Sequence, residues 1–292
     1  MKGTNHMQTN LARLIAFAGA VALESGNLAA AEPETKLALE PKLPSAEDVQ
    51  KSLQNPIGSM ISVPLETTFD FGAPDGEATF IQLQPVYPFS LGDWNLVNRT
   101  IIPLIDAPGP ITGNPGNPSP AQGKGAFGLG DILHTTFLSP ANPGNIIWGV
   151  GPAINLPTAT HEILGSGKWS TGPAVVLLSQ PQPWSIGVLV ANLWSFAGDS
   201  DRASVNQLML QPFVSYNLGD GWYLTTAPIL TANWNAGSSD RWLVPVGGGV
   251  GKLFNIGKQP VNLNLQAYGN VEKPAGAPDW ALRFTIQFAF PK

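Results

Sequence analysis

Cysteine and histidine, the side chains most often used for covalent and metal chemistry, are scarce in this sequence. Cysteine is absent, and beyond residue 31 only two histidines occur, His134 and His161. No Gly-x-Ser-x-Gly segment is present, and the spacing of serine, histidine and acidic residues builds no catalytic triad. Histidines and carboxylates also do not cluster as metal ligands do. We therefore predict that the protein is not an enzyme and that it has no cofactor.

A second set of polar side chains recurs at every second position and is mostly uncharged. Its members are Glu66, Asp70, Gln82, Gln84, Arg99, Asp131, Asn155, Gln207, Gln211, Asn262, Asn264, Gln266, Tyr268, Arg283 and Gln287. Facing a common space, such side chains would line a narrow path for small neutral or weakly polar solutes. For the five charged members the alternative is internal pairing that holds the protein together, for example Arg99 or Arg283 with Asp131 or Glu66.

Apolar residues alternate with these polar ones, and this period of two is typical of β-strands with two different faces. Twelve such segments occur, at 59–71, 77–89, 94–105, 127–138, 145–157, 168–179, 184–196, 204–217, 222–234, 241–253, 260–270 and 280–290. Their length of 11–14 residues suits a tilted transmembrane strand, which needs about 9–11 residues. We predict an all-β protein, a transmembrane antiparallel up-and-down barrel of about twelve strands whose apolar face meets lipid.

The connections and the tryptophans support a membrane barrel. Connections after even-numbered segments have 4–6 residues, whereas those after odd-numbered segments have 5–21, as expected for short periplasmic turns and longer outer loops. The nine tryptophans fall near strand ends and form two predicted bands. Trp94, Trp148, Trp184 and Trp222 belong to the periplasmic band, and Trp169, Trp194, Trp234, Trp242 and Trp280 to the outer band.

Two features of the predicted barrel stay open. Eight prolines lie inside the predicted strands, where several must mark bulges or kinks because proline lacks a ladder donor. They are Pro64, Pro85, Pro103, Pro152, Pro173, Pro212, Pro228 and Pro245. The long connection 106–126 is rich in Gly, Pro and Asn, and either folds inward as a constriction or extends outside the barrel.

The chain divides into three parts. Residues 1–31 have a basic start, an apolar core at Leu14–Leu23 and the sequence Ala29-Ala30-Ala31, as in a cleaved export signal. Residues 32–56 are charge-rich and form a periplasmic lead-in, either disordered or with a short helix that starts after Ser45 and stops before Pro56. Residues 57–292 form the barrel, and the N-terminal segment is a second candidate for filling its lumen.

The overall composition excludes two other classes of protein. Charged residues make up 12% and the net charge is −5, whereas a nucleic-acid binder carries a positive patch. No run of about 18 apolar residues exists that would predict a helical membrane protein. The expected partners are outer-membrane lipids, a small-molecule solute and the barrel-assembly machinery.

Short motifs in fixed order also point to a family. They are Asn55-Pro56, Ile61–Pro64, Phe69–Gly72, Trp94–Leu96, Arg99–Ile101 with Pro103, Gly128–Asp131, Trp148–Pro152, Leu156–Thr160 and Leu164–Trp169. Over residues 55–292 the chain resembles a family of bacterial outer-membrane transporters related to the barrel proteins of phenol-degradation (meta-pathway) clusters, members of which are sometimes mislabelled neuromedin U. The resemblance implies a barrel and suggests uptake of small, aromatic compounds. It supplies no catalytic residues.

The function predicted from these features is facilitated diffusion of small solutes through the outer membrane of a Gram-negative bacterium. The alternatives are a lipid-modifying enzyme of the outer membrane and a structural or adhesive barrel without transport. The oligomeric state stays open between a monomer and a trimer.

Overall fold

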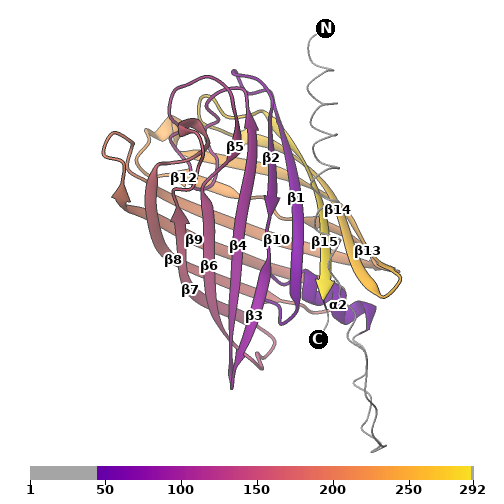
Figure 1. Cartoon of the computed structure of the whole chain (residues 1–292). Coiled ribbons are helices and arrows are strands. Elements are labelled where there is room, and N and C mark those ends of the chain that lie inside the picture. The colour runs from indigo at the N-terminus through magenta and orange to yellow at the C-terminus, as the bar shows by residue number, and fades with distance from the viewer. Residues whose placement is uncertain (1–44, 291–292) are drawn as a thin grey trace, which may run out of the picture. The chain divides into compact units, whose positions relative to one another are not determined.

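Strand pairing closes the sheet into a ring in the computed structural model, which describes residues 45–290. The first strand, β1 (Ile61–Phe71), pairs antiparallel with the last, β15 (Trp280–Phe290). On the opposite side, β9 (Trp184–Gly198) pairs with β10 (Asn206–Gly219). The predicted closed antiparallel barrel of twelve strands is confirmed (Figure 1). The predicted export signal lies outside the described residues, as does the lead-in up to residue 44.

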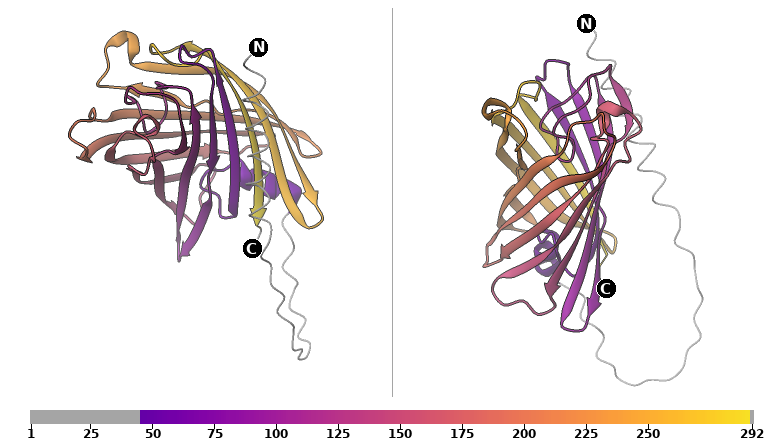
Figure 2. Two further views of the ribbon diagram at one scale, coloured as in Figure 1. Left: turned by 45° about the horizontal axis from the view of Figure 1, so that its top comes forward. Right: turned by 90° about the vertical axis from the view of Figure 1, so that its left-hand side faces the viewer.

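The other strands follow one another around the ring as antiparallel neighbours, and Figure 2 shows the ring from two further directions. They are β2 (Ala78–Leu83), β3 (Val86–Leu91), β4 (Trp94–Ala107), β5 (Ala126–Leu129), β6 (Ile132–Pro140), β7 (Ile147–Leu156), β8 (Lys168–Ser179), β11 (Trp222–Thr226), β12 (Leu230–Asn233), β13 (Trp242–Ile256) and β14 (Gln259–Glu272). Two short 3-10 helices lie in loops, η1 (Glu162–Leu164) and η2 (Ser238–Asp240).

Three of the twelve predicted strands are divided into two pieces each, namely β2 with β3, β5 with β6, and β11 with β12. Pro85 and Pro228 lie in the first and third of these breaks, and Pro245 lies at a shift of register in β13. Proline has no backbone N–H to give to the ladder, so these three mark the predicted irregularities. The remaining five of the eight prolines lie within continuous strands.

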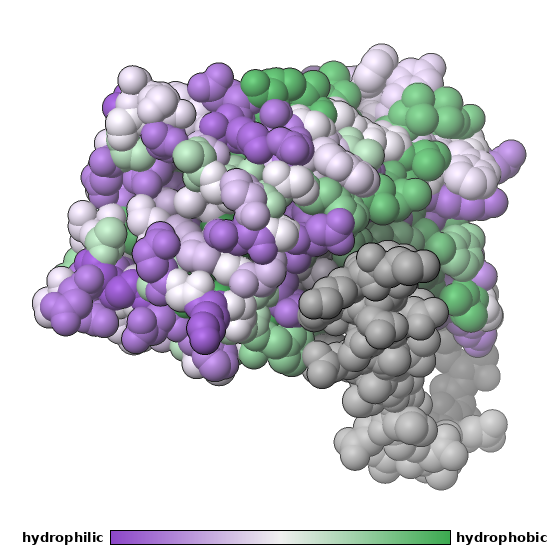
Figure 3. Space-filling view, turned by 90° about the horizontal axis from the view of Figure 1, so that it is seen from above, coloured by the Kyte–Doolittle hydropathy of each residue, from purple (hydrophilic) through white to green (hydrophobic). Residues whose placement is uncertain are grey.

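The outside of the barrel is apolar along most of its height. Large hydrophobic side chains are exposed on many strands, among them Leu91, Val175, Leu224 and Phe288. Aromatic rings meet near both ends of the strands: Trp94 contacts Trp148, Trp184 contacts Tyr216, and Trp234 contacts Trp242. Seen from the end that carries the long loop, the molecule is largely hydrophilic, with hydrophobic residues gathered toward one side (Figure 3).

The interior is not uniformly polar. Phe137, Val176 and Leu193 point inward from β6, β8 and β9 and are fully buried in one apolar cluster with residues of neighbouring strands. We call the inward residues of β6–β9 the apolar side of the wall and those of β1, β2, β14 and β15 the polar side. The prediction that lipid takes the apolar face and the lumen the polar face is therefore wrong along β8 and β9, which are apolar on both faces.

The helix α2 (Ala46–Leu53) precedes the barrel and lies at the end opposite the long loop (Figures 1 and 2). Ser45 caps it, because its side chain accepts a hydrogen bond from the Asp48 backbone N–H while the Asp48 side chain binds the backbone of Ser45. The predicted short helix after Ser45 is confirmed. In the part of the chain described, no helix has the length and apolar character needed to cross a membrane.

Candidate functional site

Two cavities lie side by side inside the barrel, with volumes of about 90 and 110 Å³. The first is lined from β1, β2, β4 and β6 on one side of the ring and from β9 and β10 on the other. The second is lined from β1, β2, β14 and β15. Glu66, Gln82, Asn114, Pro115 and Ile229 border both cavities, so the two spaces adjoin. Together they form the candidate site.

The connection between β4 and β5 folds into the barrel and forms one wall of both cavities. Gln207, only 1% exposed, accepts a hydrogen bond from Gly116 N (3.0 Å) and donates to the carbonyl of Asn114 (3.4 Å). Thr231 donates to the carbonyl of Gly113 at 3.2 Å. These bonds hold residues 113–116 against β10 and β12, so the inward alternative for the loop is the one observed. We call residues 113–116 the loop tip.

A charged pair of the polar side lies opposite the loop tip. Arg283 Nε is 3.5 Å from Glu66 Oε1, and both side chains are largely shielded from solvent. Arg283 also donates to the carbonyl of Ala227 at 3.0 Å and lies 5.1 Å from the ring centre of Tyr268. The alternative of internal pairing thus applies to Arg283 and Glu66. Asp70 lines the 110 Å³ cavity without an ion pair among the described residues.

Arg99 is held by glutamines instead of a carboxylate. Its Nη2 donates to Gln84 Oε1 at 2.8 Å, and Gln84 Nε2 donates to Gln82 Oε1 at 2.9 Å. All three side chains line the 90 Å³ cavity. A guanidinium has five N–H donors, and Arg99 makes one side-chain hydrogen bond among the described residues. Its other donors are free to meet an acceptor oxygen in the cavity.

Asp131 borders the same cavity but serves mainly to hold a loop. It accepts hydrogen bonds from Asn155 Nδ2 (3.2 Å), from Ala159 N (3.2 Å), and from both Ser166 N and Ser166 Oγ at 2.7 Å. The suggested pairing of Asp131 with Arg99 or Arg283 is wrong. A carboxylate that accepts several backbone and side-chain donors is already satisfied, and here the donors come from β7 and the loop after it.

The remaining predicted lumen residues divide into two kinds. Gln211 lines the 90 Å³ cavity and donates to the carbonyl of Ala227 at 3.5 Å. Gln207, Asn264 and Gln266 do not border either cavity. Asn264 donates to Tyr223 Oη at 3.4 Å, and Gln266 accepts from Tyr268 Oη, so these amides are used in packing.

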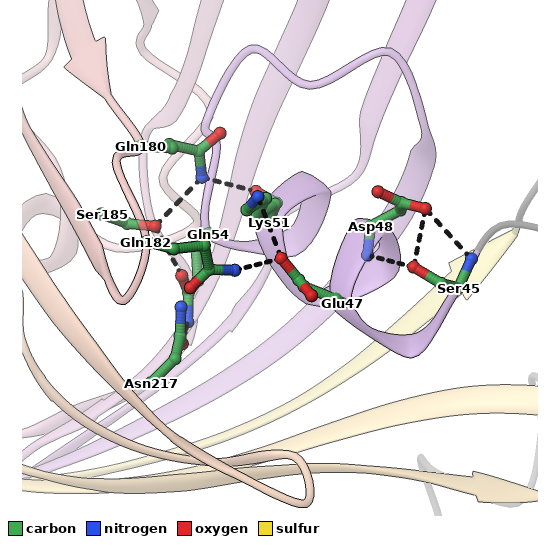
Figure 4. Close-up of polar contacts among 9 residues, drawn as sticks. All are labelled: Ser45, Glu47, Asp48, Lys51, Gln54, Gln180, Gln182, Ser185 and Asn217. Atoms are coloured by element: carbon green, nitrogen blue, oxygen red, sulfur yellow. Dashed lines mark hydrogen bonds and ion pairs between the residues drawn. The ribbon is translucent and has the colours of Figure 1, made fainter.

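At the other end of the barrel, α2 is bound by side chains of three strands and their turns (Figure 4). Gln54 donates to Asn217 Oδ1 at 2.9 Å and accepts from Ser185 Oγ at 2.7 Å. Gln180 donates to the carbonyl of Lys51 at 2.9 Å. The Lys51 ammonium and Gln182 both hydrogen-bond Glu47, and they hold the pKa of that carboxyl below its usual range.

Apolar contacts of α2 lie on the other side of the helix. Val49 packs in a buried cluster with Leu253 of β13 and Ala289 of β15, next to Leu53 and Met60. A cavity of about 1160 Å³ is lined by residues of the helix and of the turns after β10 and β13. The barrel is thus narrowed at one end by the loop tip and at the other by α2.

Several residues that complete the two cavities were not among the predicted lumen residues. Asn114 and Pro115 come from the loop, and Leu189, Met209 and Ile229 are apolar members of the lining. The signal for the first two was the long connection 106–126, rich in Gly, Pro and Asn, which was predicted either to fold inward as a constriction or to extend outside. Within residues 45–290, no group of three or more His, Asp or Glu side chains is placed to hold a metal ion.

Comparison with solved structures places the barrel among known ones. The chain is similar to an outer membrane channel from Pseudomonas putida F1, with a TM-score of 0.58, 16% identity, and coverage of 81% of this chain and 97% of that chain. The fold is that of a bacterial outer-membrane β-barrel. No protein-family model and no curated protein sequence matches the chain, so membership of the phenol-degradation family stays a prediction.

Lower similarity extends to barrels with different activities. Outer membrane phospholipase A from Escherichia coli has a TM-score of 0.42 and 15% identity, covering 85% of this chain and 98% of that one. The toluene transporter TodX of P. putida has a TM-score of 0.37 and 10% identity, covering 83% and 92%. At these identities the similarity concerns the fold alone.

The prediction that the chain is not an enzyme is corrected by these neighbours. A phospholipase is among the barrels of similar structure, so the absence of soluble-hydrolase motifs is no ground for excluding catalysis. Function resides in the site and not in the fold.

Proposed function

We propose that this protein is a channel in the outer membrane of a Gram-negative bacterium, through which small neutral or weakly polar solutes pass by facilitated diffusion. The observation that carries the proposal is the pair of adjoining cavities inside the closed ring, between the loop tip and the strip formed by Glu66, Gln82 and Arg99. Outer-membrane lipids, the solute and the barrel-assembly machinery are the proposed partners.

The size and lining of the cavities favour a small solute with one polar group. Volumes of about 90 and 110 Å³ are far below the roughly 300–1,000 Å³ of sites for drug-sized ligands. Leu133, Leu189 and Met209 supply apolar surface in the same cavity as Arg99, whose free donors suit a hydroxyl or carbonyl oxygen. A small aromatic ring with one oxygen substituent matches this lining. The resemblance to barrels of phenol-degradation clusters suggests the same class of solute.

Liposome swelling tests the proposal directly. The folded protein is reconstituted and placed in polyols and sugars of increasing mass, and light scattering reports their entry. We expect entry of the smallest solutes, a steep decline with mass, and slower entry when phenol is present on both sides as a competitor. Swelling no faster than in protein-free liposomes would contradict the proposal. Release of fatty acid from phospholipid micelles, measured on the same preparation, assays the catalytic alternative.

A pair of deletions tests whether the loop tip sets the size limit. Removal of residues 114–116 should raise the swelling rate and admit larger solutes, because this segment borders both cavities. Removal of residues 200–201 from an exposed loop is the matched control and should change neither. Equal effects of the two deletions would show that the path does not run past the loop tip.

A further inference from the structure

Four polar side chains lie together on two neighbouring strands, β4 and β6, on the outer surface of the barrel. We call them the outer quartet: Asn98, Thr100, His134 and Thr136. Asn98 pairs across the strands with Thr136, and Thr100 pairs with His134. None of them borders the cavities or takes part in the proposed passage of solutes.

The direction in which the four side chains of the quartet point follows from the residues next to them in the sequence. Val97 and Phe137 are fully buried in the interior apolar cluster, and Arg99 and Thr135 line the 90 Å³ cavity. Side chains alternate between the two faces of a strand. The residues between these inward positions therefore point out of the barrel, toward lipid.

The quartet is joined by a chain of hydrogen bonds. Thr100 Oγ1 lies 2.9 Å from His134 Nδ1, and His134 Nε2 lies 3.1 Å from Thr136 Oγ1. Thr136 then donates to Asn98 Oδ1 at 2.8 Å. The Asn98 amide nitrogen ends the chain, and among the described residues its two hydrogens have no acceptor. An unused donor pair thus faces outward.

The quartet lies deep in the apolar belt of the barrel. Asn98 and Thr100 are four and six residues along β4 from Trp94. With a rise of about 3.3 Å per residue and a tilt of about 40°, they lie roughly 10–15 Å from the tryptophan band. Water and lipid headgroups are absent at that depth, and unpaired polar groups are costly there. Hydrogen-bonding groups of a protein partner at the same depth would satisfy the free Asn98 donors.

We propose that the outer quartet is the contact surface between two copies of this chain in the membrane. Every copy enters the membrane in the same direction, so each carries its quartet at the same depth. A two-fold axis along the membrane normal then brings Asn98 of one copy to Asn98 of the other, and a primary amide offers both a donor and an acceptor for such a pair. The inference rests on insertion of the barrel in a membrane and not on passage of solutes.

Cross-linking through single cysteines tests this surface, because the chain has no cysteine of its own. Ile154 lies opposite His134 on β7, six residues from Trp148, and its substitution leaves the quartet intact. The variant Ile154→Cys, treated in native outer membranes with a short bis-maleimide, should give a dimer as its main product. Val190→Cys is the matched control, six residues from Trp184 on β9, two strands farther around the ring from the quartet than β7, and should stay monomeric.

A second substitution assigns the contact to the quartet. Asn98→Leu in the Ile154→Cys background should reduce the dimer at least tenfold, while heat-modifiable gel mobility shows that the barrel is still folded. The proposal is overturned by equal cross-linking of Ile154→Cys and Val190→Cys, by a product containing a different protein, or by an unchanged yield with Asn98→Leu. Swelling rates of Asn98→Leu liposomes are expected to match the wild type, so the channel proposal is tested separately.

Discussion

The two sides of the interior wall differ in whether their side chains are packed together or face a cavity. On the apolar side, Phe137, Val176 and Leu193 fill the space between strands and leave no exposed surface. On the polar side, Glu66, Gln82 and Arg283 face cavities. In a small barrel the interior can be filled completely by side chains. Here the interior is filled around Phe137, Val176 and Leu193, whereas cavities remain along the polar side and border β6 and β9 only at part of their length, for example at Leu133 and Leu189.

The largest expected effect is a loss of stability from a substitution on the apolar side, and it tests whether that side is the packed core. Phe137→Ala removes a fully buried ring and should lower the free energy of unfolding by about 3–5 kcal/mol, because a cavity replaces its contacts. Urea-induced unfolding of the folded barrel measures the change. Leu138→Ala, whose side chain is 38% exposed on the outer face, is the control with a smaller loss. Equal losses would show that the apolar side is not the stabilising core.

The second substitution, at Arg99 on β4 beside the polar side, should alter selectivity more than stability. Arg99→Met removes a positive charge from the cavity while Glu66 and Asp70 remain nearby. The preference for cations should therefore rise several-fold, as read from the reversal potential in a salt gradient across a planar bilayer. Lys124→Met removes an exposed charge from the loop and should have little effect. A shift of the same size in both variants would mean that Arg99 does not face the path.

The helix α2 contacts different parts of the ring through its polar and its apolar side chains. It makes polar contacts with β9 and β10 and apolar contacts with β13 and β15. Gln54→Ala deletes two hydrogen bonds worth about 1 kcal/mol each, so exchange of the α2 amide hydrogens should accelerate roughly thirtyfold. Lys51→Ala is the control for the barrel contacts, since its side chain pairs with Glu47 within the helix and its carbonyl, which accepts from Gln180, is retained. Unchanged exchange in Gln54→Ala would show that the apolar contacts alone hold the helix.

The smallest expected effect is a dependence of α2 docking on pH. Hydrogen bonds from Lys51 and Gln182 lower the pKa of Glu47 in the folded protein. A carboxyl with a lowered pKa contributes stability above its ordinary pKa and loses it as the pH falls through the lowered value. Protection of the α2 amides should thus decrease slightly on acidification through that range. Glu47→Gln should abolish the dependence, and a dependence that persists in this variant would place the titrating group elsewhere.

Much of this architecture follows from the period of two. The alternation of Leu282, Phe284 and Ile286 with polar residues predicts β15 and its two faces, and similar runs predict the other strands. Strands with two apolar faces, such as β8, give no such contrast, and the inward packing of Val176 therefore depends on the closed ring. The position of each strand was predictable from the sequence. Which side chains point into the barrel was predictable only on strands whose inward face is polar.

The constrictions and the outer quartet depend on contacts between distant segments. Gly116 meets Gln207 and Gln54 meets Asn217 only after the ring has formed, and no local pattern encodes either contact. His134 interrupts an apolar face, and that break is visible in the sequence. The role of His134 in the outer quartet depends on Asn98, which lies on another strand.

The seam between β1 and β15 determines when the barrel can be completed. Ile61 pairs with Phe290, a separation of 290 − 61 = 229 residues, so closing this pair carries a greater loop-closure entropy than closing any hairpin of the ring. Such non-local pairings form slowly. β15 must join β1, and α2, which precedes both in the sequence, reaches its sites on β9, β10 and β13 only once those strands exist. Closure of this ring thus joins the two strands that lie farthest apart along the sequence of the barrel.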